Sequence, residues 1–372
     1  MRVLNFSIAV FAFLFISAES TRATAYGLIV PTTEQPLHVE SGESFSVRMS
    51  IPIALTPPPG VQKASVWRDW RVVLQRRVPA VYKTKDHALR YHMRFLKIRP
   101  SENNLDYVVT AQTQRWLPSG RYDLNVQGPG FSYSAAASVL VGDVQPEDDN
   151  ISVSTASASS WRFHITPGVG SPRWIELIVG KSIPGVAVSL NGASVPIADI
   201  FWASFKMRSR MRGDKAEYTG TADGRRLIRV ALPSDYRAGV VTVSQRKKAT
   251  QNQSTSVRII PAQTEIQPME WVEIRGEMSF KPLKAIWLFA DGENAVGLKT
   301  TYRWMVTTEA VAELTVFDGW GTPHRARMKK PLQMPLARNS SGCGCRMVNE
   351  PHVSILRFVF NTCFETILLL LE

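Results

Sequence analysis

Residues 89–95 read Leu-Arg-Tyr-His-Met-Arg-Phe, a strict alternation of apolar and basic side chains. Because successive side chains of a β-strand point to opposite faces, this stretch predicts a strand with one apolar face and one basic face. The same period recurs at residues 121–126, where Tyr122, Leu124 and Val126 alternate with polar residues. These patterns predict an all-β chain.

Turn-forming clusters separate the alternating runs. They lie at residues 57–60, 118–120, 128–130, 167–168, 191–192 and 223–224. Short strands with such frequent turns are typical of β-sandwiches. A turn followed by an alternating strand occurs three times, beginning at Leu117, Leu232 and Thr308, and each copy resembles the penultimate strand of an immunoglobulin-like sandwich. In the first copy we expect Tyr122 to be a corner tyrosine with a buried ring and a hydroxyl bonded to nearby backbone.

These repeats predict tandem modules. We expect immunoglobulin-like β-sandwiches over residues 26–144 and 151–261, joined by an acidic, polar segment, and a third sandwich over residues 262–335. The hydrophobic fraction of 44% and the charged fraction of 20% in 372 residues fit globular modules with hydrophobic cores. The three Cys residues all follow residue 342, so no disulfide can hold the body together.

The formal net charge of +13 directs attention to anionic partners. The densest basic stretches are residues 68–99 and 206–215. Their simplest interpretation is solvated strand faces and hairpin tips, although a basic hairpin would also attract anionic envelope polymers. No nucleic-acid-binding motif appears, so we expect no nucleic-acid partner.

The first 25 residues have the pattern of a secretory signal peptide. Arg2 precedes an apolar run over residues 3–16, and Ala23-Thr24-Ala25 supplies small residues for cleavage after Ala25. An uncleaved membrane anchor is the alternative, but the run is short for a membrane span. We expect an exported protein.

Part of the third module resembles a known family. Residues 286–292 read Ile-Trp-Leu-Phe-Ala-Asp-Gly and resemble the Trp-Asp-Phe-Gly-Asp-Gly signature of PKD domains. Residues 301–302 and 313–321 are similar to two later motifs of that family. The motif residues with a structural role are Trp287, Phe289, Asp291, Gly292, Tyr302, Asp318 and Gly321. The resemblance implies a PKD-like sandwich that acts as a spacer or binding module outside the cell, without catalysis.

A fainter resemblance concerns the end of the first module. Residues 117–130 resemble the sandwich that precedes calcineurin-like phosphoesterase domains in some exported bacterial proteins. That enzyme family uses Asp-x-His and Gly-Asn-His motifs to hold two metals, and this sequence contains neither. The six His residues are scattered, and no Gly-x-Ser-x-Gly or Cys-x-x-Cys motif occurs. We therefore expect no catalytic residues, no metal site and no cofactor.

Two features suggest adhesion. Trp67 and Trp70 would form a platform for a sugar ring if both were exposed, although most Trp residues belong to cores. Arg212-Gly213-Asp214 is the cell-adhesion tripeptide and lies in a basic stretch that is expected to form a hairpin.

The C-terminal segment, residues 336–372, resembles a sorting signal. Residues 339–345 read Asn-Ser-Ser-Gly-Cys-Gly-Cys and precede a mostly apolar tail. This order resembles the MYXO-CTERM signal of myxobacteria, in which the Cys motif marks processing and anchoring at the cell surface. The resemblance implies such a role for Cys343 and Cys345, but the terminal Arg cluster of that signal is missing here. The alternative is a final amphipathic helix packed on the third module.

Together these features predict a non-catalytic, exported bacterial protein of the cell surface or outer membrane, with a binding or spacer role. Its expected partners are cell-envelope polymers, glycans or another protein, with possible membrane attachment through the tail. Two alternatives stay open: an exported hydrolase, or the remnant of one, related to calcineurin-like metallophosphoesterases, and an adhesin for glycan or matrix.

Overall fold

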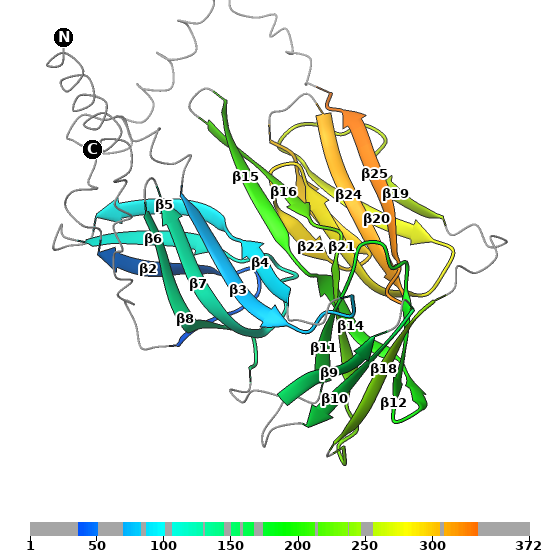
Figure 1. Cartoon of the computed structure of the whole chain (residues 1–372). Coiled ribbons are helices and arrows are strands. Elements are labelled where there is room, and N and C mark those ends of the chain that lie inside the picture. The colour runs from blue at the N-terminus through cyan, green and yellow to red at the C-terminus, as the bar shows by residue number, and fades with distance from the viewer. Residues whose placement is uncertain are drawn as a thin grey trace, which may run out of the picture. The chain divides into compact units, whose positions relative to one another are not determined.

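The computed structural model describes most of the chain between residues 36 and 333. The described ranges are 36–50, 70–82, 87–100, 106–128, 131–144, 150–156, 159–166, 174–212, 215–236, 238–246, 256–305 and 309–333. They belong to one compact unit, residues 1–333. All regular elements in these ranges are β-strands (Figure 1). Within this described part, no helix has the length and apolar character that crossing a membrane requires.

The first sandwich contains a seven-stranded sheet and a three-stranded sheet. The seven-stranded sheet has the order β1 (Leu37–Val39), β8 (Phe131–Val141), β7 (Gly120–Gly128), β3 (Arg71–Val78), β4 (His87–His92), β15 (Phe205–Arg212) and β16 (Lys215–Ala222). The facing sheet has the order β2 (Ser44–Ser50), β6 (Asp106–Gln112) and β5 (Arg94–Pro100). Both sheets bury apolar residues in the same core.

The second sandwich pairs a five-stranded sheet with a three-stranded sheet. The five strands are β13 (Ala193–Val195), β12 (Val186–Leu190), β18 (Gly239–Gln245), β10 (Ser160–Thr166) and β9 (Asn150–Ala156). The three strands are β11 (Trp174–Val179), β17 (Arg226–Ala231) and β14 (Ile197–Trp202). Their inward residues join the core of the first sandwich in one continuous cluster.

The third sandwich has a separate core for most of its residues. One sheet has the order β22 (Asn294–Val296), β21 (Pro282–Phe289), β24 (Glu309–Asp318) and β25 (Pro323–Pro331). The other has the order β19 (Val257–Pro261), β20 (Trp271–Met278) and β23 (Lys299–Arg303). Strand pairing therefore groups residues 257–261 with the third sandwich, whereas the sequence reading placed them at the end of the second. The prediction of an all-β chain of tandem sandwiches is confirmed.

The alternating stretch at residues 89–95 forms parts of two strands, β4 and β5, which lie in different sheets. β4 ends at His92, Met93 donates its backbone N–H to the Val72 carbonyl at 2.8 Å, and β5 begins at Arg94 in the facing sheet. All four apolar side chains of the stretch are buried in the shared core. The predicted division into an apolar and a basic face is therefore correct, although the chain changes sheets in its middle.

Tyr122 is a corner tyrosine, as its position in the turn-and-strand repeat predicts. Its ring is fully buried, and its hydroxyl donates a 2.7 Å hydrogen bond to the Pro118 carbonyl four residues upstream. The second repeat places Tyr236 after a similar Leu-Pro-Ser turn, but there the backbone N–H bonds to Pro233. The Tyr236 hydroxyl has no hydrogen-bond partner among the described residues.

Aromatic side chains pack where the chain passes from β14 of the second sandwich into β15 of the first. Phe205, at the start of β15, packs edge-on against Trp116 with ring centroids 5.5 Å apart, and Trp116 packs against Tyr91 at 6.0 Å. The Tyr91 hydroxyl donates a 2.6 Å hydrogen bond to the Trp202 carbonyl of the second sandwich. Gly220 leaves room for the Phe205 ring, because a Cβ there would lie 2.1 Å from its Cζ atom.

A buried carboxylate between two guanidinium groups completes this junction. Glu176 on β11 contacts Arg76 on β3 at 2.7 Å and Arg229 on β17 at 2.7 Å. Arg229 also donates to the Ser119 hydroxyl at 2.9 Å, so the network reaches the corner turn of the first sandwich. Gly120 admits the Arg76 side chain, since a Cβ there would lie 2.5 Å from Arg76 Nη1. The two sandwiches are therefore fixed by directed contacts as well as by apolar packing.

Replacing the corner hydroxyl tests the turn directly. Tyr122→Phe removes the bond to Pro118 and leaves a buried carbonyl unpaired, so we expect the free energy of unfolding to fall by about 1–2 kcal/mol. Tyr236→Phe is the matched control, because its hydroxyl has no partner to lose, and we expect a change of less than about 0.5 kcal/mol. Urea unfolding curves measure both, and equal losses in the two variants would contradict the assignment.

Removing the buried charge tests the junction. In Glu176→Gln the guanidinium groups of Arg76 and Arg229 lose their counter-charge, so we expect the free energy of unfolding to fall by about 3–5 kcal/mol. Glu273→Gln is the control: Glu273 pairs with Lys299 on the surface at 2.7 Å, and the expected loss is about 0.5 kcal/mol.

The same site predicts an acid limit. Burial raises the pKa of Glu176, but the charges of Arg76 and Arg229 outweigh it and hold the pKa below its ordinary value of 4.5. The stabilisation is therefore complete above pH 4.5 and is lost as the pH falls through the lower pKa of the folded state. A Glu176→Gln chain whose stability kept the full acid dependence of the unchanged protein would contradict this account.

Candidate functional site

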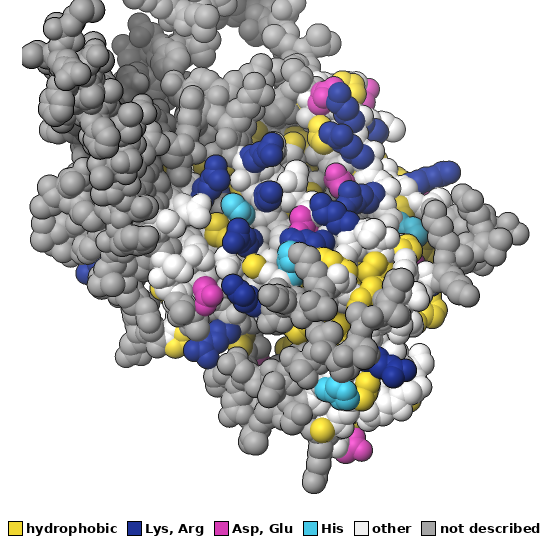
Figure 2. All heavy atoms as spheres, in the orientation of Figure 1, with side chains coloured by type: hydrophobic (Ala, Val, Ile, Leu, Met, Phe, Trp, Pro, Cys, Tyr) yellow, Lys and Arg dark blue, Asp and Glu magenta, His cyan; other side chains and the backbone are white. Residues whose placement is uncertain are grey.

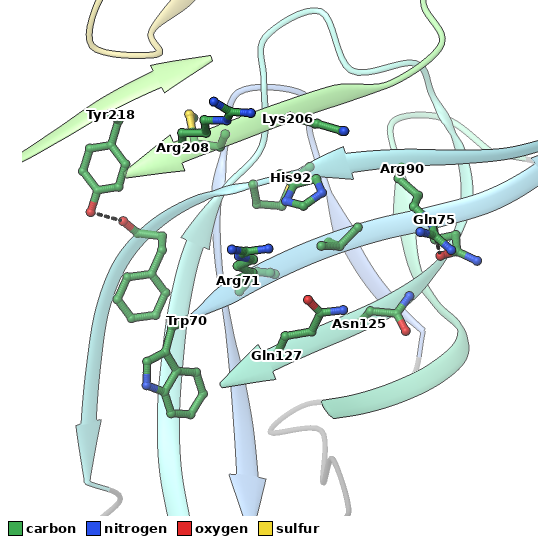
Figure 3. A pocket seen from close by; sticks show the side chains of 15 residues that line it. Trp70, Arg71, Gln75, Arg90, His92, Asn125, Gln127, Lys206, Arg208 and Tyr218 are labelled. Atoms are coloured by element: carbon green, nitrogen blue, oxygen red, sulfur yellow. Dashed lines mark hydrogen bonds between the residues drawn. The ribbon is translucent and has the colours of Figure 1, made fainter. Parts of the chain in front are cut away.

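A cavity of about 740 Å³ opens on the outer, polar face of the seven-stranded sheet. Side chains from β3, β4, β7 and β15 surround it, with Tyr218 from β16 at one end (Figure 3). Its basic side chains are Arg71, Arg90, His92, Lys206 and Arg208. Its amides are Gln75, Asn125 and Gln127. Among the described residues that line this cavity, none carries a carboxylate.

Strand register explains why these side chains meet. Val73 on β3 pairs with His92 on one side and with Asn125 on the other. One step along the ladder, Gln75 pairs with Arg90, and the Arg90 guanidinium donates to the Gln75 amide oxygen at 3.1 Å. Side chains opposite one another in a sheet have Cβ atoms about 5 Å apart, so each pair presents its polar groups together.

The hairpin of β15 and β16 supplies the other wall. Phe205 pairs with Tyr91 in parallel register and points into the core, so the next residue, Lys206, emerges on the outer face beside β4. Lys206 and Arg208 are both exposed. Basic side chains that are far apart in the sequence therefore share one recess, and in the view of Figure 2 Lys and Arg side chains are spread over the visible face while acidic ones are fewer.

His92 reports the electrostatic state of this recess. Burial and then the positive charges of Arg71, Lys206 and Arg90 lower the pKa of the imidazole from 6.5 to about 4. His92 is therefore neutral at physiological pH, and one of its ring nitrogens is available as an acceptor. The nearest acidic residue by register is Asp123, which lies opposite Gln75 in the ladder but does not line the cavity.

A second cavity of about 810 Å³ adjoins the first and shares Arg90, His92 and Lys206 with it. Its remaining lining residues are Tyr82, His87, Ala88, Gly180, Lys181, Ser182, Ser204, Asp223 and Arg225. The carboxylate of Asp223 is already engaged, because it forms an ion pair with Arg225 and accepts the Arg225 backbone N–H at 2.9 Å. The second cavity thus also presents a net positive wall.

The predicted sugar platform is not formed as two exposed rings. Trp70 is only 6% exposed and stacks on Phe95 with ring centroids 6.4 Å apart, although its edge lines the first cavity. Trp67 lies outside the described residues. Of this pair, Trp70 therefore contributes mainly to the core.

The adhesion tripeptide falls at the connection between β15 and β16. Arg212 ends β15 and pairs with Lys215, which begins β16, as expected for a hairpin. Gly213 and Asp214 lie outside the described residues. Of the tripeptide, the structure therefore describes only Arg212, and the role of the motif in adhesion stays a prediction.

The structure places the residues of the PKD-like motif in the core and in the turns of the third sandwich. Trp287 and Phe289 are buried in the core of the third sandwich, and Tyr302 stacks on Phe289 with ring centroids 3.7 Å apart. Asp291 accepts the Glu293 backbone N–H at 3.0 Å, and Gly292 has a φ of 85°, as an Asp-Gly turn requires.

The closing turn of the same module is equally well defined. Asp318 accepts the backbone N–H groups of Trp320 at 2.9 Å and Thr322 at 3.0 Å, and it contacts His324 at 3.2 Å. Gly321 has a φ of 71° and donates its backbone N–H to the Asp318 carbonyl at 2.9 Å. Membership of the PKD family is not established by these contacts and stays a prediction.

The predicted signal peptide with Ala25, and the predicted sorting signal with Cys343 and Cys345, lie outside the described residues. Within the part that the structure describes, no group of three or more His, Cys, Asp or Glu side chains is arranged to hold a metal ion. The expectations for cleavage, anchoring and catalysis are thus carried by the sequence alone.

Sequence reasoning identified the basic stretches but not the recess that they form. Residues 68–99 and 206–215 were expected to be solvated faces and hairpin tips. The one available signal is that residues 90–92 and residues 206–208 each carry two basic side chains two positions apart, which would lie on one face of a strand. Nothing in the sequence indicates that β15 lies beside β4, so the recess itself could not be found.

Comparisons with known proteins support no closer assignment. No family model and no curated protein matches the chain. Solved structures similar to this chain include the Ig1–Ig3 ectodomain of mouse nectin-like molecule 4, at 11% identity, 82% of this chain, 98% of that chain and a TM-score of 0.19. A bacterial ice-binding adhesin is similar at 11% identity over 84% of this chain and 99% of the adhesin chain, with a TM-score of 0.20. Titin domains I67–I69 are similar at 11% identity over 84% of this chain and 100% of the titin chain, with a TM-score of 0.16. These TM-scores are too low to transfer a family or a function to this chain.

The neutral His92 gives a direct measurement of the basic recess. We expect an NMR titration of the imidazole to give a pKa of about 4. In the variant Arg90→Gln/Lys206→Gln we expect that pKa to rise but to stay below 6.5, because two neighbouring charges are removed while burial, the largest cause, and Arg71 remain. Arg258→Gln/Arg327→Gln removes two exposed charges of the third sandwich and is expected to leave the value unchanged. An imidazole that titrates near 6.5 in the unchanged protein would contradict the geometry.

Proposed function

We propose that this chain is a non-catalytic, exported binding protein of the cell surface that holds an anionic partner in the basic cavity on β3, β4, β7 and β15. The observation that carries the proposal is the convergence of four permanent cations, Arg71, Arg90, Lys206 and Arg208, in a recess that no carboxylate lines among the described residues. An anion placed there gains charge-assisted hydrogen bonds from several directions.

The neutral imidazole and the amides favour the same role. His92, Gln75 and Asn125 are half-buried and lie between the exposed cations, where they can bond to neutral oxygen or hydroxyl groups of a bound partner. Mutual repulsion among the cations is relieved when an anion binds, so a binding role gives this arrangement a physical purpose. A spacer without a ligand would have no need for it.

The rigid junction supports binding rather than chemistry. One wall of the cavity comes from β15, which joins the sheet of the first sandwich, and Phe205 fixes that strand beside β4 by pairing with Tyr91 and packing on Trp116. A preorganised recess loses little conformational freedom when it binds. The proposal therefore assigns the sandwich junction the task of keeping the cations in place.

The proposed location rests on the sequence of residues 1–25 and on the Cys-bearing segment near residues 343–345. A mature chain that begins at Tyr26 and is reached by a membrane-impermeant label on intact cells would support it. A chain that keeps Met1 and is protected from the label would contradict it.

A pair of matched polymers tests the binding role. We expect the mature protein to bind immobilised dextran sulfate and not neutral dextran. The variant Arg90→Gln/Lys206→Gln should bind roughly tenfold more weakly, since each exposed cation contributes about 0.7 kcal/mol. At about 1 M salt, where the screening length is about 3 Å, binding should be largely lost.

Arg258→Gln/Arg327→Gln is the control, because it lowers the net charge by the same amount on the third sandwich. We expect surface plasmon resonance to show nearly unchanged affinity for this variant. Equal weakening by the two double variants would mean that net charge alone drives binding, and the cavity would then not be the site.

A further inference from the structure

The two cavities on the junction of the first and second sandwiches share one wall. Arg90, His92 and Lys206 line both, while Arg71 lines the first alone and Lys181 lines the second alone. Cations are therefore distributed along both recesses rather than concentrated at one point.

This layout fits an extended ligand with repeated charges. The cavities, of about 740 and 810 Å³, offer far more space than a single small anion fills. A ligand that occupied only the first cavity would not reach Lys181, and one that occupied only the second would not reach Arg71. A chain molecule that carries a negative charge on successive units would meet the cations of both.

The neutral groups of the recess select among polyanions. The first cavity is lined by the amides of Gln75 and Asn125, which are half-buried, and of the exposed Gln127, and the second cavity adds the exposed hydroxyl of Ser182. Such groups exchange hydrogen bonds with ring hydroxyls, which acidic sugars carry beside their carboxylate or sulfate groups. A sugar chain can therefore use the amides as well as the cations.

Other polyanions fit less well. Single-stranded nucleic acid binds through exposed aromatic rings, but Trp70 is 6% exposed and Tyr218 donates its hydroxyl to the Phe95 carbonyl while Arg94 covers its ring. An anionic membrane presents headgroups in a plane and would reach exposed cations such as Arg71 without engaging the half-buried amides. The recessed amides thus favour a thin, hydroxyl-bearing chain.

We infer that the two cavities form one continuous track for an acidic polysaccharide. This inference rests on the proposed anionic binding role and names its ligand class. Arg71 binds the chain at one end, Lys181 binds it at the other, and Arg90, His92 and Lys206 contact its middle. Carboxylates and sulfates are both suitable charged groups, since a guanidinium can bind either through paired hydrogen bonds.

Chain length is the variable that tests the track. We expect a dodecasaccharide to bind the mature protein at least roughly tenfold more tightly than a trisaccharide, because only the longer chain engages both cavities. Isothermal titration with oligogalacturonides measures this for carboxylates, and heparin fragments of the same lengths measure it for sulfates. The acid group with the larger length effect is the preferred one.

Single substitutions at the two ends locate the track. Arg71→Gln and Lys181→Gln should each weaken dodecasaccharide binding roughly threefold, and the double variant should abolish the advantage of length. Arg258→Gln is the matched control and should bind like the unchanged protein. Because all three positions are exposed, we expect each variant to fold, and circular dichroism and thermal unfolding verify this.

The outcomes separate this inference from the proposed function. If short and long chains bind equally, or if Lys181→Gln has no effect, the ligand occupies one cavity and the track is wrong while anionic binding stands. If a single-stranded oligonucleotide or phosphatidylglycerol vesicles bind more tightly than the dodecasaccharide, the ligand class is wrong. If no anionic probe binds at all, the proposed function itself fails.

Discussion

The carboxylate of Glu176 lies between the guanidinium groups of Arg76 and Arg229, and the junction of the first two sandwiches depends on it. A buried acid between two cations from different sheets has a narrow choice of geometry, so it fixes how β3, β11 and β17 meet. Apolar packing provides most of the stabilisation, but it tolerates small shifts. The ion pairs and the hydrogen bond from the Tyr91 hydroxyl to the Trp202 carbonyl fix the relative orientation of the two sandwiches.

From this junction the basic recess follows. β15 belongs to the second sandwich in chain order, yet Phe205 inserts its ring beside Trp116 in the first, and the strand then extends the sheet next to β4. Lys206 is carried to the outer face with Arg90 and His92. The lowered pKa of His92 reflects burial and the concentration of positive charge that results. An anionic partner would offset that charge, and the proposed binding role rests on this.

Much of the fold could be predicted from alternation alone. The apolar face of residues 89–95, the corner role of Tyr122 and the Asp291-Gly292 turn each depend on local sequence, and the structure agrees with all three. Local signals failed where the chain changes partners: nothing in residues 89–95 shows that the strand passes between sheets at Met93. The sequence likewise predicts that β19 ends the second module. Its actual partner, β20, begins ten residues after β19 ends, and no local pattern indicates that pairing.

The basic recess could not be predicted from the sequence for the same reason. The basic residues of β4 and of β15 were visible as two separate stretches, and each resembles an ordinary solvated face. Their meeting depends on a parallel pairing between residues more than 100 positions apart, Tyr91 and Phe205. The sequence leaves open whether Trp70 is a core residue or a sugar contact, and the structure buries that ring. Tertiary pairing, which has no local signature, decided both outcomes.

Hydrogen–deuterium exchange of the protein, with and without dextran sulfate, tests the central claim most directly. The account predicts added protection in peptides that cover β4 and the first half of β15, and little change in peptides from residues 256–333. Protection confined to the third sandwich, or none at all under conditions where the polymer is bound, would contradict a binding site at the junction.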